Sequence, residues 1–117
     1  MPEASSLIAG LAPSGIAISI ITYMEAYQGV LQSTNQSGAL ADFEAFVDVV
    51  PILPLPSAVA RRCATLREQL RRQGRRLRAR ALDLIIAAMA LERDLILVTR
   101  NIDDYRDIPE LRIYSTV

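Results

Sequence analysis

Three carboxylates stand where a small protein could use them for ionic chemistry. Glu25 lies one turn into a helical pattern that follows a short apolar run, Asp83 is the one polar residue near the start of an apolar stretch, and Asp104 comes just after a second apolar run. Acids that meet at the end of neighbouring strands repel one another, and Mg²⁺ or Mn²⁺ would relieve that repulsion because these hard cations take oxygen ligands. Such an ion also generates hydroxide for attack on a phosphodiester. The pattern predicts a magnesium or manganese site formed by these three catalytic acids.

Each acid also has a purely structural interpretation. Thr22-x-x-Glu25 matches a helix capping box, so Glu25 could serve only the first turn of its helix. Asp83 could neutralise a helix N-terminus or pair with an arginine of the preceding segment. Asp104 could be an ordinary turn acid. The sequence alone leaves both interpretations open for all three.

Carboxylates and arginines must supply any ionic chemistry that the chain performs. It contains no histidine and a single cysteine, Cys63. A Ser-His-Asp or Cys-His nucleophile, a histidine metal site, a cysteine zinc cluster and an intrachain disulfide are therefore excluded. We expect Cys63 to be a small core residue.

Basic residues are concentrated in one segment although the net charge is zero. All 13 basic residues are arginines, and nine of them lie between positions 61 and 80 beside a single acid, Glu68. This band is typical of a surface for phosphate backbones or an acidic protein partner, and the plain alternative is a solvated helix face. The residues predicted to bind RNA or a partner are Arg71, Arg72, Arg75, Arg76, Arg78 and Arg80.

The length of 117 residues and the 51% apolar content predict one domain with an aliphatic core. No apolar run approaches the ~20 residues of a membrane span. The N-terminus lacks the basic start and apolar middle of a signal peptide, so we expect no membrane association and a cytoplasmic location.

The order of predicted elements indicates an α/β domain with a mainly parallel sheet of four strands covered by helices. Its strand ends would bring the helix that carries Glu25 near Asn101 and Asp104. The predicted helices are residues 2–11, 20–31, 58–73 and 81–91, together with a helix that Ser37 caps and a helical turn within 101–108. The predicted strands are residues 16–19, 51–55, 95–98 and 111–114. We expect strand 51–55 at an edge of the sheet because of its prolines.

Three segments, residues 18–29, 83–91 and 97–105, together resemble the PIN domain and, within it, the VapC-type toxin nucleases. The resemblance covers nearly the whole chain in the family's order and spacing. It implies a magnesium-dependent ribonuclease that is held by a VapB-type antitoxin and forms a homodimer. It also implies that Glu25 and Asp83 are metal-site acids, that Asp104 is the family's fourth acid, and that Thr99 and Asn101 are polar support.

One part of the family pattern is missing from the 117 residues. Family members begin with a central strand that ends in an Asp-Thr-Asn-like motif, which supplies a metal-binding Asp, and here the only acid before Glu25 is Glu3. We therefore expect an N-terminally truncated PIN-like domain in which strand 16–19 pairs directly with strand 95–98, another chain fills the gap, or the natural protein is longer; the last is favoured. The alternative function is a catalytically inactive PIN-like module that binds RNA or protein.

Overall fold

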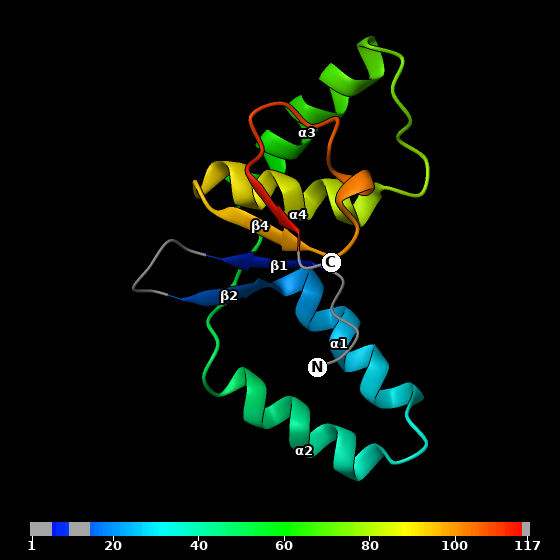
Figure 1. Ribbon diagram of the computed structural model, residues 1–117, viewed down its shortest axis with the longest axis vertical. Coiled ribbons are helices and arrows are strands. Elements are labelled where there is room, and N and C mark those ends of the chain that lie inside the picture. The colour runs from blue at the N-terminus through cyan, green and yellow to red at the C-terminus, as the bar shows by residue number, and fades with distance from the viewer. Residues whose placement is uncertain (1–5, 10–14, 116–117) are drawn as a thin grey trace.

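The computed structural model describes residues 6–9 and 15–115, and these form a five-stranded sheet with helices on both sides (Figure 1). The strands are β1 (Ser6–Ala9), β2 (Ile16–Ser19), β3 (Ile52–Leu53), β4 (Ile96–Thr99) and β5 (Ile113–Ser115). The helices are α1 (Ile20–Gln32), α2 (Gln36–Val47), α3 (Ser57–Arg72), α4 (Ala81–Glu92) and the short 3₁₀ helix η2 (Ile102–Asp104).

The sheet is mixed: β2, β3, β4 and β5 point the same way, as the predicted parallel sheet requires, and the central strand β1 runs against them. Its order is β3-β2-β1-β4-β5, with β2 parallel to β3 and β4 parallel to β5. β1 runs antiparallel to both of its neighbours, so β2 and β4 point the same way. The proline-flanked strand β3 lies at an edge, as expected, because a proline cannot donate to a second neighbour.

The prediction for the N-terminal segment is wrong. Residues 6–9 of the predicted helix 2–11 form β1, and the remainder of that helix lies outside the described residues. β1 fills the centre of the sheet, so β2 and β4 do not pair directly and the sheet has five strands instead of four. Two flanking strands offer unpaired backbone groups that a strand can satisfy and a helix cannot, which overrides the weak local helical pattern.

The main core lies between α3, α4 and β4. α3 turns Val59, Cys63, Leu66 and Leu70 inward, at the predicted spacing, onto the buried face of α4. Residues 84 and 86–90 of α4 are buried, whereas Leu82 is exposed, so α4 is a largely but not wholly buried helix. This packing fixes the start of α4, where Asp83 lies.

The helices α1 and α2 form a separate pair on the other side of the sheet (Figure 1). Phe43 of α2 holds them together through edge contacts with the rings of Tyr23 and Tyr27, at centroid distances of 5.0 and 5.6 Å. The cap of α2 is Asn35 and not Ser37 as predicted, because the Asn35 side chain accepts a hydrogen bond from the Gly38 backbone N–H. No helix of the described residues is long and apolar enough to cross a membrane.

Candidate active site

The carboxyl ends of β2 and β4 meet at one edge of the sheet, as the sequence predicted. Ile8 of β1 pairs with Ala17 on one side and with Leu97 on the other, which puts these two residues at the same level of the sheet. Two residues further along, Ser19 and Thr99 therefore end their strands at the same level, on either side of β1. This edge brings together the start of α1 and the loop that contains Asp104.

Glu25 is not a capping residue. Ser19 caps α1, since its Oγ accepts a hydrogen bond of 2.9 Å from the Thr22 backbone N–H and donates one of 3.0 Å to Thr22 Oγ1. Glu25 is the sixth residue of α1, beyond the first turn, which removes the structural explanation offered for it. Its side chain is largely exposed. The burial that remains and, after it, the negative charge of Asp83 raise the pKa of Glu25.

Asp83 occupies the first turn of α4 and is half-buried. Tyr105, which is 1% exposed, donates a hydrogen bond of 3.2 Å from its hydroxyl to Asp83 Oδ1. Burial raises the pKa of Asp83; the Tyr105 hydrogen bond opposes this, the charge of Asp104 adds to it, and Arg80 again opposes it. Asp83 thus interacts electrostatically with both other predicted acids.

Asp104 ends η2 and is half-buried at the same edge. Its backbone N–H donates to the Asn101 carbonyl at 3.0 Å, and its own carbonyl accepts a bond of 3.0 Å from Arg80 Nη2. The predicted turn of helix within 101–108 is thus a short 3₁₀ helix. Thr99, 2% exposed, accepts a bond of 3.0 Å at Oγ1 from the Asn101 backbone N–H, so Thr99 and Asn101 shape the turn that carries Asp104.

Arg80 differs from the other arginines predicted to bind RNA or a partner. Its side chain is 5% exposed and forms a two-pronged ion pair with Asp107, with Nη–Oδ distances of 2.7 and 2.9 Å. We therefore correct its assignment from a surface residue to an internal one. The sequence placed Arg80 next to Asp83 but gave no signal for a partner 27 positions away.

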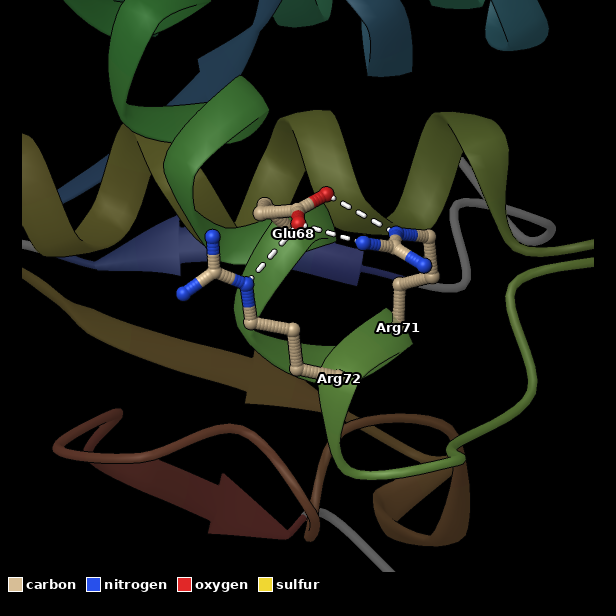
Figure 2. A network of polar contacts seen from close by, with 3 residues as sticks. All are labelled: Glu68, Arg71 and Arg72. Carbon is tan, nitrogen blue, oxygen red and sulfur yellow. Dashed lines mark hydrogen bonds and ion pairs between the residues drawn. The ribbon is translucent and has the colours of Figure 1, made fainter.

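The other five arginines of that set are exposed. Figure 2 shows that Glu68 accepts hydrogen bonds from both Arg71 and Arg72, and these bonds lower the pKa of Glu68 to about 2. No acid partner is found within the described residues for Arg75, Arg76 or Arg78. Arg75 lies close enough to Asp107 for its charge to help lower the pKa of that carboxyl, after the larger effects of Arg80. The connector between α3 and α4 thus carries positive charge without ion pairs, and Arg75 brings part of it near Asp107, three residues after Asp104.

Comparison with known proteins gives this edge a family context. The model of the PIN domain matches residues 3–111. The chain belongs to the PIN-domain family. It is 34% identical over 97 residues to the tRNA(fMet)-specific endonuclease VapC of Shigella flexneri. The aligned region covers 83% of this chain and 72% of the relative.

Solved VapBC structures share the fold. VapBC2 from Rickettsia felis, bound to a promoter DNA fragment, superposes with a TM-score of 0.78 at 27% identity and covers 86% of this chain and 74% of that one. VapBC-5 from Mycobacterium tuberculosis, a member of the VapBC family of toxin-antitoxin systems, gives a TM-score of 0.71 at 32% identity over 86% of this chain and 81% of that one. The predicted PIN-like fold and VapC-type resemblance are confirmed.

The acids of this PIN domain fit a hard divalent cation held through few protein ligands. Among residues 15–115, no three His, Cys, Asp or Glu side chains form a group that could hold a metal ion. Mg²⁺ nevertheless binds through one or two carboxylates with water completing its shell. Glu25 and Asp83 provide two carboxylates whose charges repel each other, which suits such an ion. The assignment of Glu25, Asp83 and Asp104 as metal ligands stays a prediction.

Proposed function

We propose that this chain is a VapC-type toxin that cleaves RNA phosphodiester bonds with Mg²⁺, or Mn²⁺, at its acidic edge. The observation that carries the proposal is the placement of three acids, Glu25 of α1, Asp83 of α4 and Asp104 of η2, at the shared end of β2 and β4. In agreement with this placement, Asp83 raises the pKa of Glu25 and Asp104 raises that of Asp83. The tRNA(fMet)-specific VapC relatives make initiator tRNA the first substrate to test.

The chain's own residues divide the work as follows. Glu25 and Asp83 would hold the ion, and Asp104 would keep a third negative charge beside Asp83. When bound, the metal supplies an acidified water and neutralises charge on the phosphate. Thr99 and Asn101 hold the turn in which Asp104 lies.

Exposed arginines supply the RNA-binding surface in this proposal. Arg75, Arg76 and Arg78 carry charge that no acid of the described residues neutralises, and their connector borders the acidic edge. Arg71 and Arg72 extend the same surface along α3, although they share Glu68. RNA phosphates bound here would pass next to Asp83.

We also propose a homodimer and a VapB-type antitoxin as partners, with the protein acting in the cytoplasm. The VapBC complexes among the structural relatives support the antitoxin. For the dimer, α1 exposes Ile20, Met24, Tyr27 and Leu31 at steps of four, three and four residues, which is the spacing of a helix seam. A stripe of this kind is self-complementary across a two-fold axis, so we assign it to a second copy of the chain.

Removal of the metal and of Asp83 tests the catalytic proposal. Initiator tRNA cleavage in Mg²⁺ or Mn²⁺ should stop in EDTA and fall at least about 100-fold in Asp83→Asn, because a ligand and its charge are lost. Asp42→Asn, which changes an exposed acid of α2, is the control and should cleave normally. Cleavage that survives both EDTA and Asp83→Asn would contradict the proposal. RNA binding without any cleavage would favour the inactive RNA-binding module.

A further inference from the structure

The start of α4 and the segment that contains Asp104 and Asp107 are joined by hydrogen bonds donated from each to the other. Arg80, directly before α4, donates from Nη1 and Nη2 to the two carboxylate oxygens of Asp107 at 2.9 and 2.7 Å. Nη2 also donates to the Asp104 carbonyl at 3.0 Å. The start of α4 therefore holds the acidic loop at two points.

The loop holds α4 in return. The Tyr105 hydroxyl, at the end of a buried side chain, donates to Asp83 Oδ1 at 3.2 Å. Tyr105 follows Asp104 directly, and Asp83 lies three residues after Arg80. A shift of Asp83 relative to Asp104 would break a buried contact in one direction or the other.

We propose that Arg80, Asp107 and Tyr105 form a clamp that fixes the position of Asp83 relative to Asp104, so that these three act as positioning residues of the metal site. The role toward metal rests on the function proposed above. The tyrosine keeps one oxygen of Asp83 occupied, which leaves the other for a ligand, as outer partners of metal-binding carboxylates do.

Stability alone explains this ion pair poorly. The side chains of Arg80 and Asp107 are 5% and 18% exposed, and Arg80 Nε is buried with no hydrogen-bond partner among the described residues. Burying two charges costs as much as their attraction returns, and apolar replacements are often as stable. The ion pair fixes the positions of the neighbouring acids Asp83 and Asp104, which apolar residues would not do.

The charge of Arg80 makes the sign of the effect informative. Arg80 lies near enough to Asp83 to act on it electrostatically, and a positive charge there repels a metal cation. If the ion pair acted through charge alone, neutralising Arg80 together with Asp107 would leave metal binding nearly unchanged, because the two opposite charges are lost together. The clamp requires weaker metal binding instead.

The main experiment compares two variants in which a whole ion pair is neutralised. Arg80→Gln/Asp107→Asn removes the clamp pair without leaving a lone buried charge, and Arg62→Gln/Glu92→Gln removes the 3.9 Å pair at the far end of α4 as a matched control. Calorimetric titration with MnCl₂ should show affinity reduced about 10- to 100-fold in the clamp variant and unchanged within about twofold in the control. Equal or tighter binding by the clamp variant would overturn the proposal.

Amide hydrogen exchange without metal separates this proposal from the catalytic one. The clamp variant should exchange the amides of Asp104, Tyr105 and Ile108 at least about tenfold faster than wild type, because the loop loses its anchor. If wild type binds no Mn²⁺, the proposed function fails and unchanged exchange would overturn the clamp as well. Faster exchange with unchanged Mn²⁺ affinity would also overturn it, since the acids would not depend on the loop.

Tyr105→Phe serves if the double variant does not fold. It removes one hydroxyl from a buried ring and should weaken Mn²⁺ binding about tenfold, whereas Tyr23→Phe, at the α1–α2 contact, should have no effect. Mn²⁺ affinity that Tyr105→Phe leaves unchanged would refute the clamp.

Discussion

The position of Asp83 lowers the stability of the metal-free protein when its carboxylate is ionised. Burial and Asp104 raise its pKa above the ordinary value of 3.8, so the ionised form is less favourable in the folded state than in the unfolded state. The free energy of unfolding is therefore highest below both pKa values of Asp83, where its carboxyl is protonated. It falls as the pH rises from the pKa of Asp83 in the unfolded chain through its pKa in the folded protein.

Asp83→Asn should accordingly stabilise the metal-free protein at neutral pH. The amide oxygen can still accept the bond from Tyr105, while the charge penalty is gone. Thermal melts in EDTA should show a melting temperature higher by on the order of a few degrees at pH 7, with the difference vanishing near pH 3. Asp42→Asn, on the exposed face of α2, should change neither value. A less stable Asp83→Asn protein at pH 7 would show that Asp83 is a structural acid.

At this scale the sequence identified the acids but not the residues that orient them. Glu25, Asp83 and Asp104 stood out because each interrupts or follows an apolar pattern. Arg80 with Asp107 and Tyr105 with Asp83 are pairs separated by 27 and 22 positions, and local periodicity carries no information on such contacts. Arg80 looked like the other arginines of its segment until its burial was known.

Among the elements, α1 has the exposed apolar stripe that best fits a protein partner. Its stripe of Ile20, Met24, Tyr27 and Leu31 is 38–53% exposed, although Phe43 of α2 contacts Tyr27 at the border of the stripe. Met24→Glu should separate the proposed dimer, because a charge in a helix seam must be desolvated. Light scattering should then give the mass of one chain, against two for wild type.

Val49→Glu is the matched control for this change. Val49 is 79% exposed in the turn after α2 and lies off the stripe, so this variant should keep the dimer mass. A wild-type protein that is a monomer alone but loses antitoxin binding through Met24→Glu would assign the stripe to the antitoxin. A monomer whose antitoxin binding survives would contradict any role for the stripe.

The predictability of each element followed the strength of its local pattern. β2, α3, α4 and β4 match their predicted ranges to within one or two residues, because long apolar runs and four inward positions on α3 leave little choice. β1 was mistaken for part of a helix, since four residues have no reliable period and its strand conformation comes from β2 and β4 on either side. Its central place in the sheet is a tertiary effect.

The whole molecule combines a zero net charge with an unequal distribution of that charge. The connector between α3 and α4 carries three arginines without acid partners in the described chain, and Arg75 acts on Asp107, three residues after Asp104. Attraction for phosphate therefore occurs near the carboxylates that repel one another. Arginine–phosphate contacts release counterions, and binding driven by them weakens steeply with salt.

Arg75→Gln/Arg76→Gln/Arg78→Gln should therefore lower both RNA affinity and its salt dependence. For single-stranded RNA the slope of log affinity against log salt should become shallower by about 2, since each lost phosphate contact contributes roughly 0.7. Fluorescence anisotropy from 50 to 300 mM KCl, in Ca²⁺ to prevent cleavage, measures both quantities. Arg93→Gln/Arg112→Gln, which removes two exposed arginines at the opposite edge of the sheet, should leave the slope unchanged. A slope that the triple variant does not alter would mean that the arginine connector is a solvated face and that RNA reaches the acids by another route.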